Sequence, residues 1–287
     1  MSEGLIFKPD NTRQISFLPL DSIFRPILEI TASSCGGVNW TMFFALVVHV
    51  LGSRHFANYR MNIIPRHVNQ PLLGEIFRLG TPITITQFLN GAMFTVAAVV
   101  VGMISAATLA AQQIVYSVIY LSLSAAGALG DAVRVRVAYG IGRRSVDSSL
   151  LSANISFILA GITTLVAALI LWIAPRALVG IFLDTADPEN ARVLEISVAL
   201  SAYAGMFLLL DGVLMVVANA IRGLRDTRSP LWISMAGYWA VGLGSGVVLC
   251  FPMGYGAEGL WWGLVAGVVF SNILMYWRFK RRIADAR

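Results

Sequence analysis

Residues 79–130, LGTPITITQFLNGAMFTVAAVVVGMISAATLAAQQIVYSVIYLSLSAAGALG, contain no Asp, Glu, Lys, Arg or His. A membrane-spanning helix needs about 20 apolar residues, each rising about 1.5 Å. The stretch is long enough for two crossings, and we expect the turn between them near residues 102–108. Its apolar runs lack the alternation of barrel strands, which favours helices.

The composition of the whole chain agrees with this stretch. Hydrophobic residues make up 57% of the 287 and charged residues 13%, whereas a soluble domain carries about a quarter charged residues. Lipid must therefore act as solvent, and the backbone must be satisfied inside helices. We predict an all-α polytopic membrane protein with about seven transmembrane helices, at residues 33–52, 80–103, 108–130, 150–173, 194–220, 231–251 and 257–277.

Basic residues predict the orientation in the membrane. Four segments (54–78, 131–149, 222–228 and 278–287) hold 16 Lys and Arg, against two in the alternate loops. By the positive-inside rule, these four segments and the C-terminus are expected to be cytoplasmic. This topology explains the net charge of +6, and no nucleic-acid partner is expected.

Two sequence patterns in the last span predict how its helix packs and where it meets the membrane interfaces. Gly259, Gly263 and Gly267 recur every four residues, which is typical of close helix packing. Aromatic side chains at the span ends predict belts at the membrane interfaces, namely Trp261, Trp262, Tyr276 and Trp277.

Between Ile196 and Ile221, Asp211 is the only Asp, Glu, Lys, Arg or His. An unpaired charge in lipid costs at least roughly 2.5–3.5 kcal/mol. A chain accepts this cost when the group faces a cavity, binds a cation or carries a proton. The alternative is a structural acid that is hydrogen-bonded to a hydroxyl such as that of Ser201 or Thr86.

Other polar residues in the spans allow two interpretations. Gln87 and Asn90 lie three residues apart, on one helical face, and are expected to line a cavity together with Thr86. Polar packing between helices explains them equally well. Gln113 has the same ambiguity, with packing favoured. Arg222, Arg225 and Asp226 form part of a cytoplasmic loop, either as a gate or as anchors at a helix end.

Catalytic chemistry finds little support in the sequence. His49, His55 and His67 lack a carboxylate arrangement for metal binding. Cys35 and Cys250 are isolated, and no phosphate-binding loop is present. We therefore expect no enzyme, no metal site and no cofactor.

Short motifs in a fixed order carry a resemblance to a known family. They are Gly80-Thr-Pro-Ile83, Leu109-Ala-Ala-Gln-Gln-Ile114, Arg136-Val-Ala-Tyr-Gly-Ile-Gly142, Leu210-Asp-Gly-Val213, Ile221-Arg-Gly-Leu-Arg-Asp-Thr-Arg-Ser-Pro230, and Tyr238-Trp239 followed by Gly242. In order and spacing, the motifs resemble the second half of the MATE (multidrug and toxic compound extrusion) family, nearest to its NorM-like branch. Family members have twelve spans in two six-span lobes.

The resemblance divides the chain into three parts. Residues 1–32 form an atypical N-terminal segment that is expected to result from truncation. Residues 33–78 hold a single span and a cytoplasmic linker, and residues 79–287 form a six-helix C-terminal lobe. The resemblance thus implies a missing N-terminal lobe as a partner. It also implies a multi-pass protein of the bacterial inner membrane, with the lipid bilayer around it.

The resemblance further implies efflux of cationic or amphipathic compounds by H⁺ or Na⁺ antiport. Asp211 occupies the family's acid position in this lobe, whereas Asn90 stands where a second acid is often found. Phe207, four residues before Asp211, replaces a hydroxyl that would help to bind a cation. Tyr238 belongs to the residues expected to line the cavity. The single acid favours proton coupling.

Two other functions remain open. One is a flippase for lipid-linked sugars, although these spans hold almost no basic residues and such flippases tend to have more inside the cavity. The other is a non-transporting remnant.

Overall fold

The structure is a computed structural model that describes residues 40–41, 43–49, 70–183 and 187–285. The predicted segment 1–32 lies outside the described residues. The span predicted at 33–52 is described only at 40–41 and 43–49, which are helical. Residues 69–287 form a separate compact unit, and the description below concerns this unit.

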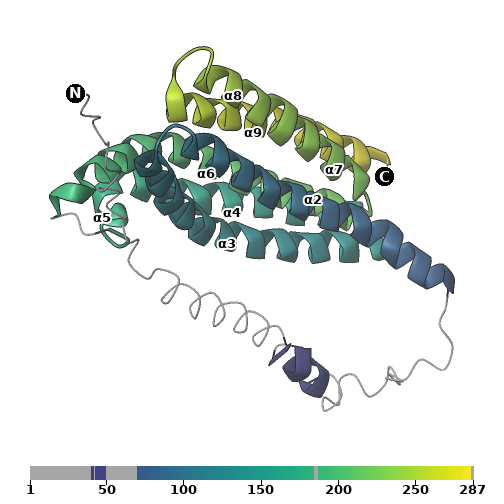
Figure 1. Cartoon of the computed structure of the whole chain (residues 1–287). Coiled ribbons are helices and arrows are strands. Elements are labelled where there is room, and N and C mark those ends of the chain that lie inside the picture. The colour runs from purple at the N-terminus through teal and green to yellow at the C-terminus, as the bar shows by residue number, and fades with distance from the viewer. Residues whose placement is uncertain (1–39, 42, 50–69, 184–186, 286–287) are drawn as a thin grey trace, which may run out of the picture. The chain divides into compact units, whose positions relative to one another are not determined.

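Six helical segments in the described part are long and apolar enough to cross a membrane (Figure 1). They are α2 (Gln70–Gly102), α3 (Ala106–Gly142), α4 (Val146–Ile173), α6 (Ala191–Gly223), the composite span Arg228–Cys250 and α9 (Gly256–Asp285). Two short helices, α5 (Pro175–Val179) and η2 (Pro188–Asn190), lie between α4 and α6. The chain is an all-α polytopic membrane protein, and this prediction is confirmed.

The composite span contains a widened segment at its centre. It consists of α7 (Arg228–Ser234), the π-helix η3 (Met235–Leu243) and α8 (Gly244–Cys250). A π-helical turn inserts extra backbone into a helix and often occurs at functional sites. In this span it carries Tyr238.

The turn predicted near residues 102–108 is present between α2 and α3. Ser105 caps α3, with its side-chain oxygen accepting a hydrogen bond from the backbone N–H of Thr108 at 3.0 Å. Three helices run well past the predicted ends: α2 begins at Gln70, α3 ends at Gly142 and α9 ends at Asp285. Hydropathy detects only the apolar part of a helix, whereas backbone hydrogen bonding continues through polar residues.

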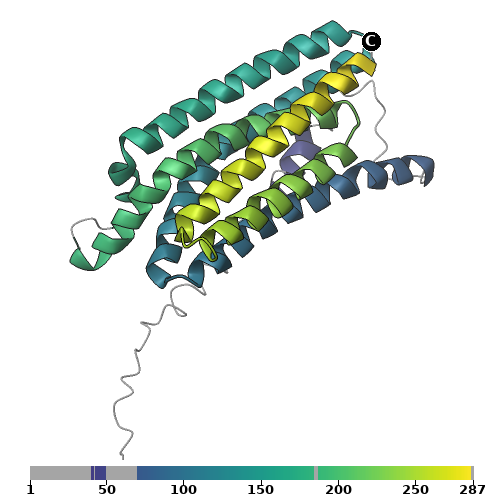
Figure 2. The same cartoon turned by 90° about the horizontal axis from the view of Figure 1, so that it is seen from above.

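Helix α6 forms the centre of the unit and packs against α3, α4 and α9. Seen from above, α4 and α2 lie at opposite edges (Figure 2). The outer face of α4 exposes apolar side chains at helical spacing, including Ile155, Ile158, Ile162 and Val166. Such a face suits contact with lipid.

The glycines of α9 allow close contact with the composite span. A Cβ added at Gly263 would overlap the backbone of Gly246, and one at Gly259 would lie 2.8 Å from the carbonyl carbon of Leu249. Gly267 similarly meets the carbonyl oxygen of Gly237. The packing predicted from the glycine spacing is confirmed.

The belt prediction is wrong for Trp261, which is fully buried. Its ring packs against Phe207 and Tyr116, with centroids 5.9 and 5.7 Å away. Trp261 lies on the inner face of α9, and sequence alone did not show which aromatics share that face. Trp262, Tyr276 and Trp277 are exposed.

Candidate functional site

A cavity of about 500 Å³ lies between α2, α3, α6 and the first part of the composite span. This volume falls in the range of small-molecule sites. One stripe of α6 supplies a wall, with side chains at helical spacing on one face: Asp211, Met215, Ala218, Asn219 and Arg222.

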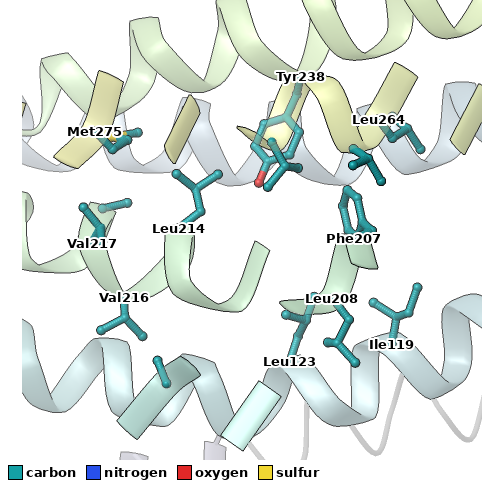
Figure 3. Close-up of a cluster of buried hydrophobic side chains, with 14 of the residues drawn as sticks. Ile119, Leu123, Phe207, Leu208, Leu214, Val216, Val217, Tyr238, Leu264 and Met275 are labelled. Carbon is teal, nitrogen blue, oxygen red and sulfur yellow. The ribbon is translucent and has the colours of Figure 1, made fainter. Parts of the chain in front are cut away.

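Asp211 is buried in this wall, with 8% of its surface exposed. The Tyr238 hydroxyl donates a hydrogen bond to its carboxylate. Figure 3 shows this hydroxyl pointing from η3 toward the α6 segment that carries Leu214 and Phe207. The π-helical segment thus brings a phenol to the single acid of the apolar stretch.

Ser201 and Thr86, the two hydroxyls named as possible partners of Asp211, bond elsewhere, although the expected kind of bond, from a hydroxyl on another helix, is present from Tyr238. The Ser201 hydroxyl donates to the carbonyl of Ser197, and that of Thr86 donates to the carbonyl of Pro82, both at 2.7 Å. These bonds satisfy each hydroxyl within its own helix. The bond from Tyr238 depends on the packing of two helices, so helical spacing could not reveal it.

Helix α2 supplies another part of the lining through Thr86, Gln87 and Asn90. Asp211 and Asp131 are the acidic residues that line the cavity in the described part of the chain. Asp131 forms an exposed ion pair with Arg134 at 3.0 Å. Asn90 thus contributes a neutral amide to the cavity lining.

Two residues expected to line the cavity do not do so. Phe207 is fully buried in the core, with its ring against Phe94 and Trp261 at 6.0 and 5.9 Å. Phe207 lies one turn before Asp211 on α6, but aromatic side chains of α9 and α2 cover α6 at that turn. Gln113 is exposed on α3, about two turns before Tyr120, the first residue of α3 that reaches the cavity.

The three loop residues predicted together have separate contacts. Arg222 lines the cavity and donates from Nη1 to Oδ1 of Asn219 at 3.4 Å. Arg225 is exposed and pairs with Glu75 of α2. Asp226 is buried between two arginines of α9, with 2.7 Å to Arg278 Nη2 and 2.9 Å to Arg282 Nε.

Asp226 fastens the segment between α6 and α7 to α9. Burial opposes its ionisation, but hydrogen bonds from Arg282, the Ser229 backbone N–H and Arg278 outweigh burial and lower the pKa of Asp226 to about 2. The carboxylate is therefore charged at neutral pH. This fastening was not predicted from the sequence.

Basic residues line one end of the cavity, where Arg134 and Arg222 lie near Asp131. The expectation that the spans place almost no basic residue in the cavity is wrong at this end. Both arginines lie on helices, because α3 and α6 continue into segments that hydropathy assigns to loops. The spacing of four, eight and eleven residues from Asp211 could have identified Met215, Asn219 and Arg222. The described residues contain no group of three or more potential metal ligands.

Comparison with known proteins agrees with this architecture. The family model MatE matches residues 82–248. The probable multidrug resistance protein NorM of Burkholderia pseudomallei is 35% identical over 248 residues, which cover 85% of this chain and 52% of the relative. The multidrug resistance protein NorM of Burkholderia vietnamiensis is 35% identical over 249 residues, covering 86% and 53%. The chain thus spans about half the length of these curated relatives.

Solved structures share the fold. The crystal structure of the eukaryotic MATE transporter AtDTX14 matches with a TM-score of 0.75 and 17% identity, covering 86% of this chain and 55% of that one. A multidrug resistance MATE family transporter of the MOP superfamily, in an inward-facing conformation, matches with a TM-score of 0.64 and 15% identity, covering 78% and 51%. The family match over more than half of the chain and the NorM relatives show that this chain belongs to the MATE family, in its NorM-like branch.

Proposed function

We propose that this chain forms one lobe of a multidrug efflux transporter in which Asp211 exchanges a proton for a cationic or amphipathic compound. The observation that carries the proposal is the buried Asp211 carboxylate in a cavity wall, hydrogen-bonded by Tyr238. An intramembrane acid that faces a cavity is a functional group by default. The printed names of the relatives, multidrug resistance proteins, support the substrate class.

The side chains around Asp211 favour a proton over Na⁺ as the coupling ion. A hard cation requires several oxygen ligands. Asn90 lines the wall without a charge, and Phe207, one turn before Asp211, is apolar and buried away from the cavity. The second cavity acid, Asp131, is already paired with Arg134. A proton needs one acceptor, which Asp211 supplies.

The transport step follows from one acid that serves two ligands in turn. The charged Asp211 binds a cationic substrate, and a proton from the outer side later neutralises the carboxylate and releases the substrate. Tyr238 donates to the carboxylate when it is charged, so it holds the side chain in the cavity wall. The proton then leaves on the inner side, which restores the charge.

Alternating access requires a second repeat against which this lobe moves. We infer that a six-helix N-terminal lobe, as expected from relatives about twice as long, completes the cavity. The basic segments support a cytoplasmic C-terminus in a bacterial inner membrane. The activity is transport without a catalysed covalent reaction.

Coexpression tests this function. The full chain is expressed in drug-sensitive bacteria with and without the N-terminal lobe of a NorM relative, and accumulation of a cationic dye is measured. We expect efflux only with both lobes, and its loss in Asp211→Asn at normal levels of inserted protein. Asp285→Asn is the control, because Asp285 is exposed at the end of α9. Unchanged efflux in Asp211→Asn would remove the coupling role.

A further inference from the structure

The Arg222 guanidinium has unused hydrogen-bonding capacity inside the cavity. Its Nη1 donates to Asn219 at a long 3.4 Å, and its buried Nε has no partner within the described part of the chain. The described residues also place no carboxylate within ion-pair distance of Arg222. A buried charged donor without an acceptor is costly. The Nε atom itself is enclosed, but Arg222 lines the cavity, so its Nη atoms can receive an acceptor from a ligand.

Arg222 and Asp211 lie on one face of α6. They are eleven residues apart, which is close to three full turns and places their Cα atoms roughly 16 Å from each other. Helical side chains tilt toward the N-terminus, and the contact with Asn219 draws the guanidinium one turn toward Asp211. Both side chains line the same cavity.

The two ends of this cavity differ in charge. Around Arg222 lie Arg134 and Asp131, so two positive groups face one negative group. The exposed Asp131–Arg134 pair already uses that negative group. Asp211 contacts the neutral Tyr238 at the other end. The cavity therefore presents one buried acid and, about three helical turns away, an excess of positive charge.

We propose that Arg222 forms a carboxylate-binding subsite, so that the cavity accepts zwitterionic compounds whose cationic group binds at Asp211. The cationic half rests on the proposed function above. Arginine suits this task because its planar fork binds a carboxylate through two parallel hydrogen bonds. Asn219 orients the fork. An anchor at the membrane surface would instead extend into the polar interface, whereas the Nε atom of Arg222 is buried.

The test compares two dyes that differ in one charge. Tetramethylrhodamine carries a cation and a free carboxylate, and its methyl ester keeps the cation alone. Binding of each dye to the purified full chain in detergent is measured by fluorescence polarisation. Arg222→Gln should bind the acid about tenfold more weakly, the loss expected for a charge-assisted hydrogen bond, and should bind the ester as wild type does. Arg222→Lys should be intermediate for the acid.

Two controls separate this subsite from other effects. Arg225→Gln removes a nearby arginine that is exposed and paired with Glu75, and it should bind both dyes normally. Asp211→Asn should weaken both dyes equally. Retained ester binding shows that the Arg222 and Arg225 variants are folded.

Each contrary result overturns a defined part of the reasoning. Equal binding of the acid to wild type and Arg222→Gln, or failure of wild type to bind the acid, refutes the subsite. Intact binding of both dyes to Asp211→Asn refutes the role of Asp211 in binding the cationic group. The ratio of acid to ester binding in Arg222→Gln still tests the carboxylate subsite separately.

Discussion

Replacing Asp226 by asparagine removes the negative charge that Arg278 and Arg282 share. The carboxylate has 4% of its side-chain surface exposed, and the two arginine side chains have 28% and 39%. Asparagine retains the shape but leaves two positive groups without their counter-charge. We therefore expect the variant to be less stable, with α9 held more weakly against the segment between α6 and α7.

The size of the loss follows from the pKa of Asp226, which is about 2 instead of the usual 3.8. A difference of one in pKa corresponds to about 1.4 kcal/mol. The lowered pKa of Asp226 therefore sets an upper bound of about 2.5 kcal/mol on the loss of folding free energy. Because the arginines are partly exposed, solvent screening reduces this to about 1–2 kcal/mol. For a chain of this size, that loss lowers Tm by roughly 2–8 °C.

Heating the detergent-purified protein and measuring the remaining monodisperse fraction gives this Tm. Glu75→Gln is the matched control, because it removes an acid whose ion pair with Arg225 is exposed, and it should change Tm by less than about 2 °C. The reasoning is refuted if both variants melt together, or if Asp226→Asn melts at the wild-type temperature.

The pH dependence has a definite sign. The pKa of Asp226 is lower in the folded state than in the unfolded state, so its contribution to stability is complete above the unfolded value of 3.8. The contribution disappears as the pH falls toward 2. The Tm difference between wild type and Asp226→Asn should be constant at neutral pH and should narrow below about pH 4.

Three further predictions concern packing, topology and the acid's partner. Gly263→Leu should prevent α9 from reaching Gly246 and should yield little monodisperse protein. Gly74→Leu, with open space around Gly74, should behave as wild type, and equal yields of the two variants would contradict the close contact. Reporter fusions after Arg144 and Arg287 should indicate the cytoplasm and one at Gly254 the periplasm, and a periplasmic signal at Arg287 would reverse the orientation. Tyr238→Phe removes the donor to Asp211 and should reduce pH-driven dye efflux in cells that coexpress the N-terminal lobe, without loss of inserted protein. Tyr255→Phe, at an exposed site, should leave efflux unchanged, and equal efflux in the two variants would show that the Tyr238 hydroxyl has no role.

The sequence was sufficient to predict the fold class, because charge-free runs of about 20 residues have few structural solutions other than membrane helices. Helix ends were less accessible. Hydropathy assigns Arg134 and Arg222 to loops, yet α3 and α6 continue through them. This difference brought two basic residues into the cavity wall that the sequence had placed outside the spans.

The candidate site was predictable only where one residue stood out from its surroundings. Asp211 did so as a lone acid in an apolar stretch. Its partner Tyr238 is 27 residues away and reaches it through a π-helical segment, which no periodicity indicates. Phe207 follows the helical period of Asp211 but lies where α6 meets its neighbours in the core. Position along a helix, as well as face, decides whether a side chain reaches the cavity.

Exchange of a proton for substrate at Asp211 is tested most directly by proton release on binding. Tetraphenylphosphonium has a permanent positive charge and no titrating group, so any protons released come from the protein. It is added to the purified full chain in weakly buffered detergent solution, and the pH change is followed over a series of starting pH values. Wild type should release up to one proton per molecule, and Asp211→Asn should release none. Equal release from Asp211→Asn, or binding to wild type without release at any pH, would contradict the exchange.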